Sequence, residues 1–155
     1  MGVSQTKSIP GLKDGNTYNL ALTGTDLAGN TADTVANTGV LYDVTPPNAI
    51  IAVPITGRNY SVLTTLSGTA SDTSAGDPSL IVKVEVRVKS ITNNTYWQGG
   101  TSWLASPAKW FDAGWVSPNW TLAAPDWNPD EVYLVEVQAT DAAGNVQTAP
   151  AQASF

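Results

Sequence analysis

The 155-residue sequence contains no cysteine and no histidine, and these two absences exclude most of the side-chain chemistry that enzymes use. Catalysis by a Ser–His or Cys–His pair needs residues that the chain lacks, and most zinc sites need histidine or cysteine ligands. Glycine motifs that bind phosphate groups or dinucleotides are also absent. The acidic residues lie in turn and linker sequences rather than in facing pairs. We therefore expect a protein that is not an enzyme.

Charged residues are scarce as well, at 13% of the chain, and 13 acidic against 7 basic residues give a net charge of −6. Binding to nucleic acid needs a concentrated basic patch, so no nucleic-acid partner is expected. No apolar run approaches the roughly 18 residues of a membrane-spanning helix, and no membrane insertion is expected. A cysteine-free chain rich in Thr, Asn and Gly is typical of an exported bacterial protein. We expect an extracellular or cell-surface location, with any signal peptide outside this sequence.

What the sequence does contain is an internal repeat with an offset of 115 residues. The segment YNLALTGTDLAGN at 18–30 matches YLVEVQATDAAGN at 133–145. Each copy predicts a strand, a tight turn and a second strand, and the period equals the size of a β-sandwich domain. Pro46 and Pro47 mark a boundary, because proline cannot donate to a strand ladder. We predict a partial repeat at 1–45, comprising its C-terminal strands, and a complete domain at 46–155.

Short segments of alternating hydrophobicity predict that the fold is all-β, an antiparallel sandwich. In the predicted strand Ile81–Ser90, the valines at 82, 84, 86 and 88 are expected to be buried. This strand is expected to lie beside a second predicted strand, Glu131–Thr140. Glu136 of the second strand should then lie among the Lys and Arg side chains of the first. The other predicted strands of the complete domain are 50–55, 64–70, 95–98, 109–112, 120–123 and 146–153. The partial repeat is predicted to contain strands at 4–9, 17–25 and 30–42. Three strands leave an apolar face exposed, so we expect them to pack against the complete domain or another chain.

These residues resemble the bacterial immunoglobulin-like (Big-type) repeats of large surface and secreted proteins. The resemblance is carried by LSGTASD at 66–72, by ATDAAGN at 139–145 and by the linker DVTPP at 43–47. It implies an antiparallel immunoglobulin-like β-sandwich preceded by the last strands of an incomplete repeat. It also implies a non-catalytic structural spacer or cell-adhesion module, whose partners are the neighbouring repeats of the same protein.

The two Ala-Gly-Asn turns each follow an aspartate, Asp26 or Asp141, and allow two interpretations. The carboxylate either accepts hydrogen bonds from the turn backbone, or it is a ligand of Ca²⁺, which prefers carboxylate and carbonyl oxygens. In an immunoglobulin-like sandwich the N-terminus, one loop and the last hairpin lie at the same end of the domain. Asp14 can approach this end as well. We predict that calcium at this end stiffens the junction between repeats, held by four carboxylates: Asp43, Asp72, Asp77 and Asp141.

All six tryptophans lie between residues 97 and 127, and they too allow two interpretations. As packing residues, Trp97 and Trp103 form a hairpin pair while Trp110 and Trp120 fill the core. As a carbohydrate platform, the rings bind glycans, and Trp115 and Trp127 are the candidates because they lie in loop-like sequence. Two alternative functions follow. One is a carbohydrate-binding accessory domain of a secreted glycan-active enzyme. The other is a self-associating filament subunit, in which another copy completes the N-terminal unit.

Overall fold

The computed structural model describes residues 8–73 and 80–155. The chain divides into two compact units, Met1–Val44 and Thr45–Phe155. The described residues contain strands, turns and loops without an α-helix, and their named strands pair antiparallel. The predicted all-β fold with antiparallel sheets is therefore confirmed. A search of the described residues for a helix long and apolar enough to cross a membrane finds none.

The first unit is a two-stranded ribbon of β1 (Asn16–Leu22) and β2 (Val35–Tyr42). Both strands are shorter than predicted, because the segment between them is mostly turn and loop. The predicted strand at 4–9 lies largely outside the described residues, and Ser8 and Ile9 are not in a strand. Apolar side chains on the ribbon face solvent, since Leu22 and Val35 are 73% and 72% exposed.

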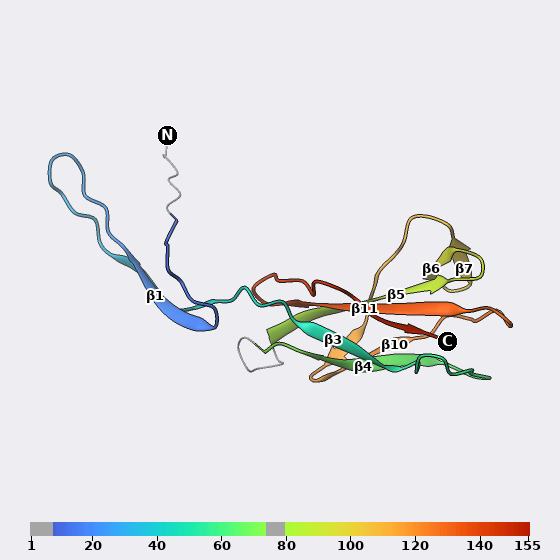
Figure 1. Ribbon diagram of the computed structural model, residues 1–155. Helices are drawn as coiled ribbons and strands as arrows, with labels where there is room; N and C mark the ends of the chain where they lie inside the picture. The colour runs from blue at the N-terminus through green and yellow to red at the C-terminus, as the bar shows by residue number, and fades with distance from the viewer. Residues whose placement is uncertain (1–7, 74–79) are drawn as a thin grey trace. The chain divides into compact units, whose positions relative to one another are not determined.

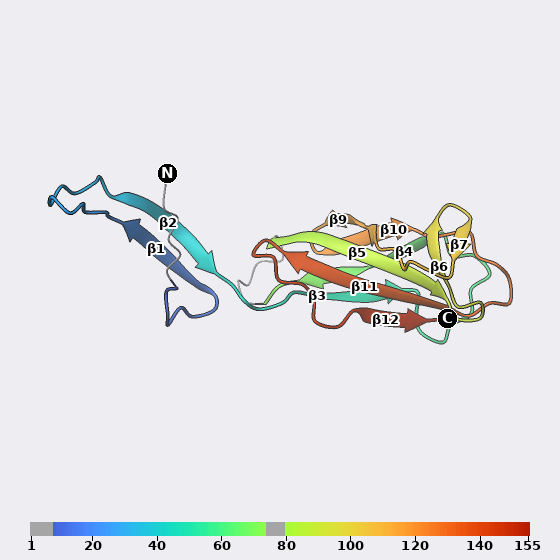
Figure 2. The ribbon, with the colours of Figure 1, turned by 90° about the horizontal axis from the view of Figure 1, so that it is seen from above.

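The second unit is a sandwich of two sheets, which Figure 1 shows as two layers. One sheet has the order β3-β4-β10-β9, formed by Asn48–Val53, Thr65–Ser71, Asn119–Ala123 and Gly114–Val116. The other has the order β12-β11-β5-β6-β7, formed by Ala151–Ser154, Tyr133–Asp141, Ile81–Ser90, Thr95–Gly99 and Ser102–Leu104. The short β8 (Phe111–Asp112) also pairs with β5. Figure 2 shows β12, β11 and β5 side by side.

The core forms where the inward faces of the two sheets meet. Leu66 and Trp120 of one sheet are fully buried, as are Val86 of β5 and Val135 of β11. Each such side chain contributes about 1.5–3 kcal/mol by leaving water. The Trp120 indole donates to the Ile50 carbonyl at 3.1 Å, so its polar group is satisfied inside the core.

The central pairing of the second sheet agrees with the sequence prediction in all but one position. β5 pairs with β11, and Arg87 Nε donates to Glu136 Oε2 at 2.6 Å. Val82, however, is 62% exposed while Ile81 is 3% exposed, so the prediction that Val82 is buried was wrong. The reason is a register shift at Thr140/Asp141, which sets Ile81 opposite Asp141. Such a bulge reverses which side chains face inward.

The two copies of the repeated sequence make the same backbone contacts. Tyr18 Oη accepts a hydrogen bond from Lys13 N at 2.7 Å, and Tyr133 Oη accepts one from Asn128 N at 2.8 Å. In each copy the tyrosine therefore holds the loop that lies five residues before it. β1 and β11 thus begin with the same local structure, although only β11 lies within a complete sandwich.

Candidate functional site

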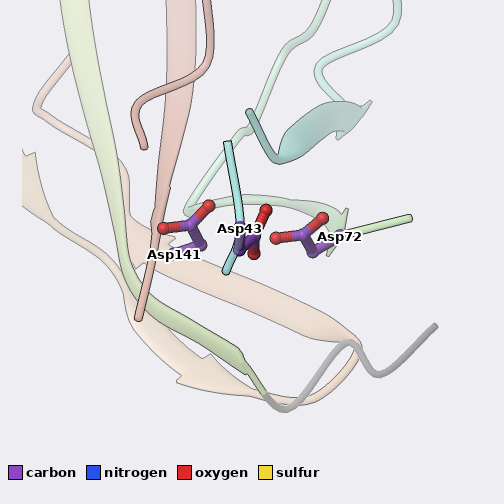
Figure 3. Close-up of side chains that lie close together, drawn as sticks. All are labelled: Asp43, Asp72 and Asp141. Atoms are coloured by element: carbon purple, nitrogen blue, oxygen red, sulfur yellow. The ribbon is translucent and has the colours of Figure 1, made fainter. Parts of the chain in front are cut away.

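Three of the four aspartates predicted to bind calcium lie close together. Asp43 follows β2, Asp72 follows β4, and Asp141 ends β11. Each offers a carboxylate oxygen, and these oxygens all lie within 4.8 Å of one another. In the view of Figure 3 the Asp43 side chain lies between the other two. We call this group the carboxylate cluster. Asp77, the fourth predicted ligand, lies outside the described residues.

All three side chains of the carboxylate cluster are buried. Asp43 is 9% exposed, Asp72 is 3% exposed and Asp141 is 1% exposed. Two ionised carboxylates within 4.8 Å repel by roughly 3 kcal/mol or more when the effective dielectric constant is about 20. A cation bound among the three carboxylates would offset this repulsion. Oxygen ligands bind Ca²⁺ at about 2.3–2.6 Å, so two ligands of one ion lie at most roughly 5 Å apart. The spacing of the cluster fits that limit.

Asp141 also accepts hydrogen bonds from the turn that follows it, as the alternative to calcium binding predicts. Its Oδ1 accepts from Asn145 N at 2.8 Å and its Oδ2 accepts from Asn145 Nδ2 at 2.9 Å. A carboxylate oxygen has two lone pairs, so each oxygen keeps acceptor capacity after one hydrogen bond. The turn fixes the orientation of the carboxylate, and a metal ligand can be the same group. The two interpretations of Asp141 are therefore compatible.

Asp26 shows what the turn does by itself. It makes the same contacts with Asn30, at 2.8 Å to the backbone N and 2.8 Å to Nδ2. The hydrogen bond from the Asn30 side chain lowers the pKa of Asp26 from its ordinary value. Asp26 is exposed, and it belongs to no group of three clustered acids among the described residues. Asp14 is also outside the carboxylate cluster, and its Oδ1 accepts from Val44 N at 2.8 Å.

The tryptophans do not form a single platform. Trp120 and Trp97 are buried, and Trp97 pairs across its hairpin with Trp103 as expected. Trp110, predicted to fill the core, lies instead 4.5 Å from the Arg87 guanidinium. Arg87 is on the outward face of β5, so the ring covers a cation rather than filling the interior. Trp115, a predicted glycan ligand, is half-buried on β9 against the core.

Trp127, the other predicted glycan ligand, lines a cavity of about 840 Å³ that we call the aromatic pocket. The pocket lies where β11 begins, whereas the carboxylate cluster lies where β11 ends. Its walls are the segments 59–64 and 124–131, together with Tyr133 and Phe155. Sequence reasoning missed these partners of Trp127, because they come from loops far apart in the chain. The repeat match of Tyr18 with Tyr133 is a sequence signal that could have drawn attention to this end of β11.

Two titratable groups in the pocket wall, Glu131 and Tyr133, have pKa values that their surroundings shift. Ser90 Oγ donates to Glu131 at 2.6 Å, and this hydrogen bond lowers the pKa of Glu131 from its ordinary value. Burial raises the pKa of Tyr133 above its ordinary value. Glu131 also accepts from Asn93 Nδ2 at 2.7 Å. The two hydrogen bonds of Glu131 join its loop to the end of β5 and to the turn that follows β5.

No protein-family model matches the chain, and no curated protein matches it either. Function is therefore inferred from the chain's own residues. Two regions of the described part of the chain bear on it: the carboxylate cluster, which fits a hard cation, and the aromatic pocket at the other end of β11.

Proposed function

We propose that the protein is a non-catalytic structural spacer of an extracellular bacterial multidomain protein, stiffened by calcium at the carboxylate cluster. Thr45–Phe155 would be one immunoglobulin-like repeat, and Met1–Val44 would contain the last hairpin of the preceding one. The observation that carries this proposal is the convergence of three buried carboxylates from three separate segments of the chain.

The order of the strands supports the immunoglobulin-like assignment. If β3, β4, β5, β9, β10, β11 and β12 are strands A to G, one sheet has the order A-B-E-D and the other contains G-F-C. An immunoglobulin constant-type sandwich has strands ABED in one sheet and CFG in the other. Tyr133 supports it as well, because a tyrosine near the start of strand F that bonds to upstream backbone is typical of such domains.

The positions of the three aspartates support a role in stiffening. Asp43 is the first residue of the linker at 43–47, Asp72 follows β4, and Asp141 ends β11. A cation bound to all three would tie the start of the linker to the domain. Calcium takes six to eight oxygen ligands, so backbone carbonyls and water would complete its coordination. In a chain of such repeats, this attachment would limit bending at each linker.

Calcium titration of the chelator-treated protein tests the proposal. At 100-fold excess over Kd, a ligand stabilises the folded state by about 2.7 kcal/mol. For a unit of this size we expect the Tm to rise by roughly 10 °C. Calorimetry should detect binding in the wild type and an affinity at least tenfold lower in Asp72→Asn and Asp141→Asn. Scattering should show a narrower range of chain dimensions with calcium than without it.

Asp26→Asn is the matched control, because Asp26 makes the same turn without the other two carboxylates. Its calcium affinity should equal that of the wild type. Equal affinity of the wild type and Asp72→Asn would contradict the site. An unchanged Tm on adding calcium would contradict the proposal that calcium stabilises the protein.

A further inference from the structure

The aromatic pocket has a floor of rings whose polar groups are already bonded to the protein. Tyr60 Oη accepts from Ile55 N at 2.8 Å, and Trp127 Nε1 donates to the Leu63 carbonyl at 2.7 Å. Both rings contact Phe155 edge-on, with centroids 5.6 Å and 5.1 Å away. The rings are therefore fixed in orientation, and the surface that they offer to a ligand is apolar.

The rim of the pocket has the opposite character. Asp126 and Asp130 are exposed, and their carboxylates make no hydrogen bond or ion pair with another described residue. Asn59, Ser61 and Thr64 add neutral polar groups, while Lys and Arg are absent from the lining. The rim thus offers hydrogen-bond acceptors, and its charge disfavours an anionic ligand.

The backbone at Asp130 is a separate observation that concerns the same rim. Its φ is 62°, in the left-handed region where glycine is preferred. Gly15 holds the corresponding position in the first unit, with a φ of 72°. The second unit therefore carries a carboxylate at a position where the backbone favours glycine. Strained residues of this kind cluster at ligand sites.

We propose that the aromatic pocket binds a neutral hexose unit of a glycan. A hexose has an apolar C–H face that fits against Tyr60 and Trp127, and hydroxyls that donate to the carboxylates of Asp126 and Asp130. The cavity, at about 840 Å³, lies within the volume range of about 300–1,000 Å³ that is typical of small-molecule sites. The assignment does not depend on calcium, because the carboxylate cluster lies at the other end of β11.

The experiment is a titration of the full chain with neutral oligosaccharides of glucose, galactose, mannose and N-acetylglucosamine, followed by NMR. The indole N–H of Trp127 reports on the site directly, since it is bonded within the pocket wall. We expect one neutral series to shift this resonance saturably at concentrations up to about 10 mM, which detects a Kd in the millimolar range. Polygalacturonate, an anionic glycan, should leave it unchanged.

The variants Asp126→Ala and Asp130→Gly should lower the affinity at least fivefold while the protein stays folded. Asp33→Ala, at an exposed acid outside the pocket, is the matched control and should bind as the wild type does. The proposal is overturned if none of the neutral series shifts the resonance, if both pocket variants bind normally, or if polygalacturonate binds equally well. A shift that depends on protein concentration alone, without sugar, would identify a second copy as the occupant and would also overturn it.

Discussion

Asp130 keeps its backbone at a φ of 62°, while Gly15 keeps the same turn in the first unit at 72°. A side chain with a Cβ is strained there by about 1–3 kcal/mol, at the lower end for Asp, which tolerates this conformation better than most residues. Glycine removes that strain but adds flexibility to the unfolded chain. We therefore expect Asp130→Gly to raise the free energy of unfolding by up to about 1 kcal/mol, as measured by urea denaturation.

Asp126→Gly is the control in the same loop, because Asp126 does not have a positive φ. It should lower the free energy of unfolding, by about 0.5–1 kcal/mol. A lower stability of Asp130→Gly would show that the Asp130 side chain stabilises the folded state. If Asp130→Gly is more stable yet binds sugar more weakly, the strained carboxylate serves binding rather than folding.

The aspartates and tryptophans also show which parts of a site can be predicted from sequence. The gathering of Asp43, Asp72 and Asp141 followed from topology, because strand order brings their segments to one end. The residues that line the pocket with Trp127 could not be predicted in this way, because loop residues far apart in the sequence share no periodic pattern. Trp110 was placed in the core, but its stacking on Arg87 depends on how a loop folds back over β5.

At the scale of one strand, Gly68 on β4 pairs with Ile51 of β3 on one side and with Trp120 of β10 on the other. A Cβ at this position would collide with the Ile50 carbonyl of β3 and lie 2.7 Å from Trp120 Nε1 of β10. These are backbone and core atoms that cannot move easily. We expect Gly68→Ala to lower the free energy of unfolding by about 3 kcal/mol, the upper range for overpacking a core, as measured by urea denaturation.

Gly114 on β9 provides the matched control for that substitution. The nearest atom to a Cβ there is the Thr121 carbonyl oxygen, at 3.5 Å, an ordinary contact. Gly114→Ala should change the free energy of unfolding by less than about 1 kcal/mol, as is usual for a site without a steric conflict. Wild-type stability of Gly68→Ala would mean that the Ile50 carbonyl and the Trp120 ring do not lie this close to Gly68.

Whole strands were predictable where they are long and alternate regularly. β5 has the bounds Ile81–Ser90 that its period of two predicted, because one face is buried and the other is wet. The three-residue strand β9 was missed, since it is too short to show a period. β7 was expected only as the Trp103 side of a hairpin with Trp97, without strand bounds. The exposed Val82 was missed because a bulge depends on pairing with β11, which the sequence of β5 alone does not contain.

At the scale of the whole molecule, the two units differ in whether each is expected to fold when expressed alone. The buried core cluster belongs to Thr45–Phe155, whereas Met1–Val44 contains a two-stranded ribbon with apolar residues in solvent. An isolated ribbon of two strands is marginally stable at best. We therefore expect residues 45–155, expressed alone, to fold with a Tm within about 2 °C of the full chain in chelator.

If the proposed function is correct, calcium should raise the Tm of the full chain more than the Tm of residues 45–155. The shorter chain lacks Asp43, so its Tm should rise less than that of the full chain when calcium is added. Differential scanning calorimetry of both chains, with and without calcium, measures this difference. Equal rises would mean that Asp43 is not a ligand. A large loss of Tm in chelator would mean that the ribbon contributes to the fold of the second unit.

β3 and β12 run in the same direction, as the arrows in Figure 2 show, and the chain enters the second unit before β3 and reaches Phe155 after β12. Tension between these two points therefore acts along the strands. It would load the hydrogen bonds of β3 to β4 and of β12 to β11 together, in shear, instead of opening them one at a time. If the proposed spacer function is correct, we expect the second unit to resist a pulling force better along its strands than across them.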